Sequence, residues 1–536
     1  MSNSKSIKNP PRLTERYSVR NAVLNYYLTL MFTVFPLFAT DRFFNIRHDK
    51  YYFFLALTGI VLIAEVMMIL NVNFSAENQT SPQNEASTKV WYKNISITDW
   101  AMIAFLVSCI ISTILSPHSL DDNLFGTAGR NNGLMLIVFY VGIYFIITRC
   151  FYYMDYVFLA FAGGSAVVFL LAVLNFHYID PLGMYVELGS NYIEDFTSTI
   201  GNKNLLSSYI CVSLPVFIAM SVHTKKTLYR AVYMAVSALG FMALMTADSD
   251  SGILGMGVFL AVFFVWYSRK IHRLKYYFLN ITIMLASAKV LKLLTFVLTS
   301  AFGCKTKQID DFQKIFVESN IGFILIIAFA VITAVLFLID YKKPQIVLSK
   351  AVPIIWGVFF GLAAIGILCV VFYFSVIDTE TDLGSFSTLM RFNEKWGTHR
   401  GFMWIKSFEI FGDFSFIEKL FGTGPDTFSH AFSPYFNELM KYGDSSTNAA
   451  HNEYINYLIT IGLVGLLSYL AVVGSCIVRA VKTAKKNPIA IVFVSAVICY
   501  SVQAFVNISQ PITTPLFIIF IALTEAVSMQ RNKAIK

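Results

Sequence analysis

The sequence carries little charge for its length. Only 14% of its 536 residues are Asp, Glu, Lys or Arg, and 56% are hydrophobic. A soluble domain has about 25% charged residues, so this composition excludes an ordinary soluble protein. Apolar runs recur from residue 22 almost to the C-terminus. Many reach the roughly 20 residues needed to cross a bilayer, so we expect a polytopic integral membrane protein.

Several other features are absent. The seven cysteines lie mostly inside apolar runs without metal-ligand spacing, so we interpret them as small hydrophobic residues. No internal repeat is visible, although many transporters are built from repeated halves. No nucleic-acid-binding module is present, and the net charge of +9 comes largely from short basic loops. We expect no metal, no other cofactor and no nucleic-acid partner.

The apolar runs predict an all-α fold with about 12–14 transmembrane helices. The expected helices are 22–40, 51–71, 98–116, 133–149, 156–175, 204–222, 229–246, 251–267, 276–302, 320–339, 350–376, 453–476, 488–507 and 511–528. We divide the chain into N-terminal transmembrane helices at 1–376 (about eleven), a large extracytoplasmic loop with amphipathic helices at 377–452, and C-terminal transmembrane helices with a cytoplasmic tail at 453–536.

Charge asymmetry predicts the orientation. Short basic loops should face the cytoplasm; these are 223–230, 268–275, 340–350 and 479–486. Alternation then places the other loops outside, namely 117–132, 177–203, 247–251, 303–319 and 377–452. The basic loop 41–50 fits poorly because alternation puts it outside, while the polar segment 73–89 falls inside.

Polar groups at the predicted outer ends of helices are the candidates for chemistry, because charges inside the bilayer are costly. Cations occur there as Arg130 in "GTAGRNNG", Lys203 in "GNKN", Arg391 and Arg400. Together with His451 they suit a negatively charged ligand held at the membrane. Each also has an ordinary interpretation: Arg400 begins an amphipathic stretch expected on the membrane surface, and charges on such helices are usually solvated.

The segment "HNEYIN" begins the predicted helix 453–476. His451 is either an interfacial histidine or a general base, since imidazole titrates near neutral pH. Asn452 and Glu453 could support it, but a first-turn acid also favours the helix dipole without any catalytic role. Local spacing does not decide between these alternatives.

The segment "HNEYINYLITIGLVGLLSYLAVV" resembles the O-antigen ligase and polymerase superfamily, the Wzy/WaaL-like proteins. His451, Asn452, Gly462 and Gly465 carry much of the match. Further similar segments occur in the same order, namely "GTAGRNNGLML", "GNKNLLSSYICVSLP", "THRGFMWIKS" and "GTGPDTF". The resemblance spans about 100–510 and includes the large loop before the last helices.

The resemblance implies a glycosyltransferase at the outer face of the bacterial plasma membrane. Its donor would be a glycan on a polyprenyl diphosphate, and its acceptor a hydroxyl-bearing glycan or lipid. Arg130 and Arg400 would hold the diphosphate, and His451 would accept the acceptor's proton in an inverting, metal-independent transfer. Family members often have Ser-Arg-Gly where this chain has "DSDSG", so Asp250 replaces a cation that Lys203 or Arg391 would have to supply.

Other functions remain open. Ligase and polymerase differ only in the acceptor, and the sequence does not separate them. The alternative from another class is a polysaccharide or lipid-linked-oligosaccharide transporter or flippase, which predicts repeated halves and a polar path through the membrane. A third alternative is a non-catalytic scaffold for envelope assembly, which leaves the ordered arginine and histidine pattern unexplained.

Overall fold

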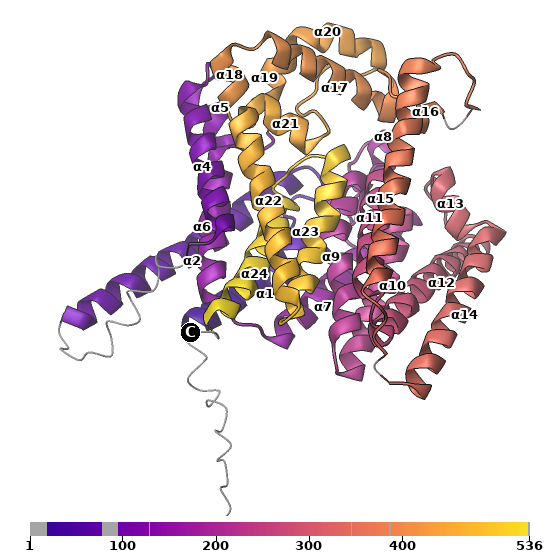
Figure 1. The fold of residues 1–536 in the computed structure, drawn as a ribbon. Coiled ribbons are helices and arrows are strands. Elements are labelled where there is room, and N and C mark those ends of the chain that lie inside the picture. Colours follow the sequence, from indigo (N-terminus) through magenta and orange to yellow (C-terminus); the bar gives the residue numbers. More distant parts are fainter. Residues whose placement is uncertain (1–18, 78–94, 128, 345, 385–386, 534–536) are drawn as a thin grey trace, which may run out of the picture.

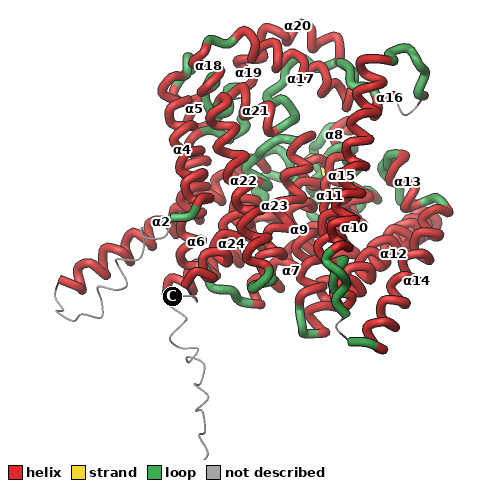
Figure 2. Tube along the Cα trace, in the orientation of Figure 1, coloured by secondary structure: helices red, strands yellow, loops and turns green. Residues whose placement is uncertain are grey.

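The computed structural model describes residues 19–77, 95–127, 129–344, 346–384 and 387–533, and these form an almost entirely helical protein. Figure 1 shows a bundle of long helices with shorter helices across one end, and Figure 2 shows that loops make up little of the rest. The expectation of an all-α fold is confirmed. Parts of the predicted loop 73–89 and of the C-terminal tail lie outside the described residues.

The long helices correspond to the predicted apolar runs. In the described ranges, eleven helices are long and apolar enough to span a membrane, and two shorter apolar helices accompany them. The bundle consists of α1 Val19–Leu37, α2 Ile46–Glu77, α4 Ile97–Leu115, α6 Leu134–Cys150, α7 Asp155–Phe176, α9 Lys203–His223, α10 Thr227–Thr246, α11 Asp250–Tyr267, α12 Ile271–Phe302, α14 Asn320–Lys342, α15 Ala351–Phe372, α22 Gly462–Ala484, α23 Ile489–Gln503 and α24 Thr514–Lys533.

Short elements connect the bundle helices and build most of one end. They are α5 Leu120–Phe125, α8 Ser190–Ile193, β1 Phe196–Thr197, β2 Gly201–Asn202, α13 Asp311–Val317, α16 Ser387–Met390, α17 Trp396–Asp413, α18 Phe416–Phe421, α19 Phe428–Phe432, α20 Phe436–Leu439 and α21 Glu453–Thr460. β1 and β2 form a small antiparallel hairpin directly before α9.

Helix α9 is the centre of the bundle. Its apolar stretch is buried along its whole length, and it packs against α10, α11 and α23. Its polar side chains fold back on their own helix, as where the Ser213 hydroxyl donates to the Tyr209 carbonyl at 2.7 Å. Small residues with internally satisfied hydroxyls let neighbouring membrane helices approach closely.

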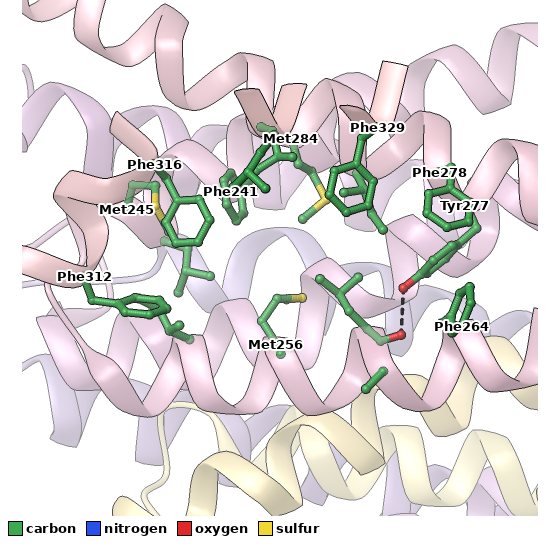
Figure 3. A pocket seen from close by; sticks show the side chains of 18 of the residues that line it. Phe241, Met245, Met256, Phe264, Tyr277, Phe278, Met284, Phe312, Phe316 and Phe329 are labelled. Atoms are coloured by element: carbon green, nitrogen blue, oxygen red, sulfur yellow. Dashed lines mark hydrogen bonds between the residues drawn. The ribbon is translucent and has the colours of Figure 1, made fainter. Parts of the chain in front are cut away.

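The far side of the bundle presents apolar surface. No residue of α15 is buried, and an apolar cavity of about 480 Å³ lies between α10, α11, α12, α14 and α15. Figure 3 shows its aromatic and methionine lining, in which the Tyr277 hydroxyl donates to the Leu260 carbonyl at 2.7 Å. Its only hydroxyl is already bonded and the Trp356 indole N–H is its one other side-chain donor, so this lining is poorly suited to orient a reacting ligand.

Residues 377–452 lie across one end of the bundle, here named the capped end (Figure 1). Their apolar side chains form a core with α21, to which α17 contributes Phe402 and Trp404 and α19 contributes Phe428 and Phe432. The expectation that the apolar side of α17 lies on the membrane surface is therefore wrong for Phe402 and Trp404. Burial against the protein removes those side chains from both water and lipid.

The basic loops predicted to be cytoplasmic gather at the opposite end. The Arg269 guanidinium donates to the Leu348 carbonyl at 3.1 Å, and His223 contacts both Tyr267 and Arg273. These contacts bring together three of the four basic loops. The same asymmetry guided the predicted orientation.

The poorly fitting loop 41–50 lies at the capped end, as alternation requires. Arg42 pairs with Glu187 at 2.7 Å, and Arg47 donates to the Gly129 carbonyl at 3.1 Å. Lys50 is buried and donates to three carbonyls near the end of α1, including that of Phe35 at 2.9 Å. Protein acceptors engage all three basic side chains. The positive charges of this loop are therefore weak guides to the orientation of the protein in the membrane.

The predicted helix 453–476 is broken into α21 and α22. Gly462 has φ +69°, and a Cβ built there would lie 2.4 Å from the backbone of Leu420. Gly422 meets the backbone of Thr460 in the same way, and the Gly424 N–H donates to the Thr460 carbonyl at 2.8 Å. The break lets the "GTGP" turn pack directly on the end of α21, which periodicity alone cannot reveal.

We predict that Gly462→Ala destabilises the protein, because alanine meets both a left-handed backbone, costing about 1–3 kcal/mol, and a backbone clash. Thermal unfolding of the purified protein in detergent measures the effect as a lower Tm. Gly474→Ala in the same α22 is the control, because its Cβ meets no atom within 4 Å. Equal Tm values for the two variants would contradict this account of the helix break.

Candidate functional site

His451 occupies the turn just before α21. The Asn452 side chain caps this helix by accepting from the backbone N–H groups of Tyr454 at 3.0 Å and Ile455 at 3.1 Å. Asparagine is a favoured N-cap residue, so the sequence fixes where the helix starts. His451 itself has φ +50°, a left-handed conformation that histidine tolerates better than most residues. Within the described part of the chain its half-buried imidazole makes no hydrogen bond.

Arg400 lies beside His451 because α17 is anchored to the same turn. Its regular helical conformation begins at Arg400, after three left-handed residues from Gly397 to His399. One turn further on, the Trp404 indole N–H donates to the Ala450 carbonyl at 3.0 Å. Residues four apart share a helix face, so this bond holds the Arg400 side of α17 against the residues that lead into His451.

The Arg400 guanidinium is half-buried, and in the described ranges it makes no hydrogen bond or ion pair. Its electrostatic neighbours are Asp250 and His451. Partial burial lowers the pKa of Arg400, while Asp250 opposes that effect. An arginine that is partly desolvated yet unpaired is available for an anionic ligand, since its planar fork binds phosphate or carboxylate oxygens in pairs.

His451 is held in its neutral form. Burial, followed by the positive charges of Arg400 and Arg130, lowers the pKa of His451 to about 3. Neutral imidazole has one ring nitrogen free to accept a proton. The turn therefore presents an unprotonated base next to an unpaired cation.

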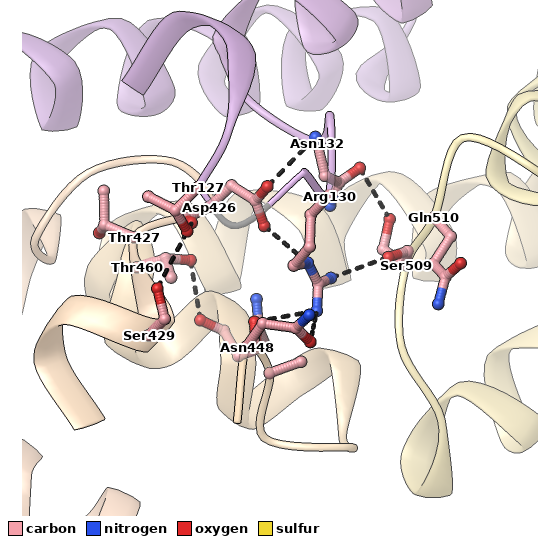
Figure 4. A network of polar contacts seen from close by, with 12 residues as sticks. Thr127, Arg130, Asn132, Asp426, Thr427, Ser429, Asn448, Thr460, Ser509 and Gln510 are labelled. Carbon is pink, nitrogen blue, oxygen red and sulfur yellow. Dashed lines mark hydrogen bonds and ion pairs between the residues drawn. The ribbon is translucent and has the colours of Figure 1, made fainter. Parts of the chain in front are cut away.

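Arg130 differs from Arg400 because protein groups already surround its guanidinium, which is only 3% exposed. Its Nε pairs with Asp426 at 2.9 Å, and its terminal nitrogens donate to the carbonyls of Asn448 and Ser509, each at 3.0 Å. Figure 4 shows this arginine at the centre of its acceptors. We name this group the Arg130 clamp.

The clamp fastens the "GTGPDTF" turn to the loop after α5. The Thr127 hydroxyl donates to the Asp426 carbonyl at 2.6 Å, and the Asn132 N–H donates to the Asp426 carboxylate at 3.2 Å (Figure 4). A buried carboxylate needs both a counter-charge and hydrogen-bond donors, and Asp426 receives both. The "GTGPDTF" turn, which sequence analysis noted only as part of the family resemblance, thus provides the counter-ion of Arg130.

Lys203 and Arg391 are also engaged by the protein. The Lys203 ammonium pairs with Asp248 at 3.0 Å and Asp195 at 3.3 Å. The Arg391 guanidinium donates to three carbonyls after α15, including that of Thr381 at 2.8 Å. Neither contributes to the charge felt by His451, which comes from Arg400 and Arg130. The structure thus brings together only some of the predicted cations.

Comparison with known families bears on the same part of the chain. Residues 315–470 match the family model described as O-antigen ligase. This protein carries an O-antigen ligase domain. The match confirms the resemblance seen in the sequence. No curated protein matches the chain.

The O-antigen ligase domain includes Arg391, Arg400 and His451, whereas Arg130 and Lys203 precede the matched range. Its C-terminal part contains α21, where Glu453 turns away from His451. The Glu453 carboxylate accepts from the hydroxyls of Tyr469 and Tyr500 inside the bundle. Asn452 and Glu453 therefore fix α21 in place rather than pointing at a common ligand.

Two residues around the Arg130 clamp were missed by sequence analysis. Asp426 was visible only as part of a turn, and Arg47 only as a misfit in topology. Arg47 is half-buried, and Arg130 and Asp426 are its electrostatic neighbours. Besides its bond to the Gly129 carbonyl, the Arg47 guanidinium has donors to spare. The accumulation of basic residues in loop 41–50 was the available signal.

Asp250, which replaces an expected cation, begins α11. Its electrostatic neighbours are Asp248 and Arg400. It therefore partly offsets the charge of Arg400 instead of adding to it. Over the described residues, no cluster of three His, Cys, Asp or Glu side chains has an arrangement suited to a metal ion.

We predict that Arg130→Met lowers thermal stability strongly, because Asp426 is then buried without its cation. Breaking one partner of a buried pair costs about 3–5 kcal/mol, which a thermal unfolding experiment in detergent detects as a lower Tm. Adding Asp426→Asn should restore part of the loss, since asparagine needs no counter-charge. Arg400→Ala is the control and should change Tm little. An unchanged Tm for Arg130→Met would refute the clamp.

Proposed function

We propose that this protein is a membrane glycosyltransferase that moves a glycan from a polyprenyl diphosphate to a hydroxyl acceptor. The observation that carries the proposal is the unpaired Arg400 guanidinium beside the neutral imidazole of His451. A diphosphate needs a cation that the protein has not already neutralised, and an attacking hydroxyl needs a base. The O-antigen ligase domain supports the same class of reaction.

In the proposed reaction, an acceptor oxygen attacks the anomeric carbon of the donor sugar. The new C–O bond forms as the bond from that carbon to the diphosphate oxygen breaks, and the diphosphate leaves with the electron pair. His451 takes the acceptor's proton and later releases it to water. Attack opposite to the leaving group inverts the anomeric carbon.

Arg400 has the role of holding the diphosphate and stabilising its growing negative charge. Arg47 is the second cation in this proposal because it has free donors near the same end of the clamp. Arg130 is assigned a positioning role, since its guanidinium already has protein acceptors. Charge stabilisation by arginines makes the proposed transfer independent of a metal ion.

We place the capped end outside the bacterial plasma membrane. The basic loops at the other end support this orientation through the positive-inside rule. A ligase would use an acceptor from a separate molecule, and a polymerase would use a second lipid-linked glycan. Both need the same base and the same cation. A transporter would instead use polar groups along a path through the bundle, while the groups described here gather at the capped end.

The central test is the activity of His451→Ala and Arg400→Ala. Loss of a general base lowers rates by about 10²–10⁴, and loss of one charge-stabilising contact by about 10²–10³. A gel of surface polysaccharide from complemented cells, with protein amount checked by immunoblot, measures both. Lys395→Ala is the control, because Lys395 is exposed and lies just before Arg400 in the chain. Normal polysaccharide from both site variants would rule out the proposed reaction.

The pH dependence tests the state of His451. With its pKa lowered to about 3, the imidazole of the free protein stays neutral as the pH falls, so kcat/KM should remain flat from about pH 7 to pH 5. A diphosphate bound at Arg400 offsets that positive charge and raises the pKa in the complex. The acid limb of kcat should therefore lie at higher pH than that of kcat/KM. An acid limb of kcat/KM near the ordinary histidine value of about 6.5 would contradict this.

A further inference from the structure

A polar cavity of about 510 Å³ opens at the capped end beside the N-terminus of α9. Its walls come from the end of α7, the hairpin before α9, the connection between α10 and α11, and the loop before α13. Lys203 and Asp248 contribute to one side, and Thr306, Lys307 and Gln308 to another. A smaller cavity of about 220 Å³ shares Thr306, Lys307, Gln308 and Phe176, so the two cavities lie side by side and are together called the hollow.

The charges that line the larger cavity are balanced, with Lys203 and Lys307 against Glu194 and Asp248. Lys203 pairs with Asp248 at 3.0 Å. Lys307 donates to the Tyr185 hydroxyl at 3.0 Å and to backbone carbonyls, including that of Phe196 at 2.7 Å. Glu194 accepts from the Tyr178 hydroxyl. A lining of satisfied charges gives little attraction for a second phosphate, but it offers many donors and acceptors to a neutral polyhydroxyl ligand.

Aromatic rings complete the lining. Phe176 and Tyr178 face the cavity together with Thr197 and Thr246. Flat apolar rings beside hydrogen-bonding groups suit sugars, which have apolar C–H faces and polar edges. Tyr178 has φ +57° and Asp248 has φ +48°. Such backbone strain in residues other than glycine collects at ligand sites, because the surrounding structure must hold it.

The cavity connects to the Arg400 and His451 site through polar contacts. Asp248 in its wall lies two residues before Asp250, which is an electrostatic neighbour of Arg400. On a second route, the Ser249 hydroxyl donates to the Asn204 side chain at 2.9 Å, and the Asn204 carbonyl accepts from Asn507 at 2.9 Å.

Two residues after Asn507, the Ser509 carbonyl accepts from the Arg130 clamp. A chain of buried polar contacts thus links the wall of the cavity to the clamp.

We propose that this hollow is a subsite for two or more uncharged sugar units of the glycan that reacts at Arg400 and His451. The inference rests on the proposed function. It assigns uncharged sugars as the ligand of a second site on the protein. Two adjacent cavities of about 510 and 220 Å³ suit more than one sugar unit. The subsite holds the glycan by hydrogen bonds and ring stacking while the diphosphate occupies Arg400.

Filling the hollow tests the proposal. Gln308→Trp and Thr306→Trp place a large ring in its shared wall from positions that are exposed or half-buried, so folding should survive. Lys305→Trp is the matched control, because Lys305 is exposed on the same loop and does not line either cavity. The assay uses purified protein in lipid nanodiscs and total lipid-linked glycan extracted from cells that lack the protein.

Both filling variants should lower glycan transfer at limiting donor by about tenfold or more, the effect of losing about 1.4 kcal/mol of binding. Lys305→Trp should match the unmodified protein, and thermal unfolding should show that all three variants fold. If the filling variants transfer glycan normally while His451→Ala is inactive, the subsite is wrong and the proposed function stands. If His451→Ala also transfers glycan normally, the proposed function fails and the subsite falls with it.

Discussion

The capped end depends on one buried ion pair, between Arg130 and Asp426. Removing two charges from water is costly, and their attraction repays that cost only when the remaining donors and acceptors are also satisfied. Here the Asn448 and Ser509 carbonyls complete the shell of Arg130, and the Asn132 N–H serves Asp426. Segments from four parts of the chain must therefore be in place together. The turn that carries His451 starts three residues after Asn448, so the clamp also sets the position of the proposed base.

This arrangement divides the arginines by what surrounds them. Arg130 cannot serve a substrate without giving up carbonyl partners, whereas Arg400 has only electrostatic neighbours. Both positive charges nevertheless act on His451, and both lower its pKa. One cation thus organises the protein and helps to keep the base neutral, while the other remains open to a ligand. The negative charge of Asp250 partly offsets the positive charge of Arg400, which is consistent with a site that binds its anion reversibly.

Sequence analysis identified the O-antigen ligase resemblance and selected both Arg400 and His451, which the structure brings together. Sequence analysis could not tell which of the predicted cations is free to bind a ligand. Lys203, Arg391, Arg130 and Arg400 share a predicted side of the membrane and a positive charge, yet protein groups engage three of them. Asp426 was overlooked as a partner because an ion pair across 296 positions leaves no local pattern (130 to 426).

The composition and apolar runs by themselves determined that this is an all-α membrane protein with a large insert before its last helices. Those properties follow from the free energy of transferring side chains from water to lipid, and each segment's own composition determines that free energy. Tertiary structure decided that the predicted helix 453–476 breaks at Gly462, that Phe402 and Trp404 of α17 face the protein, and that the Arg400 guanidinium has no bonded partner among the described residues. These three features depend on which backbone segments pack against each other and on which acceptors lie within hydrogen-bonding distance of each cation. The order of polar and apolar residues along the chain does not contain that information.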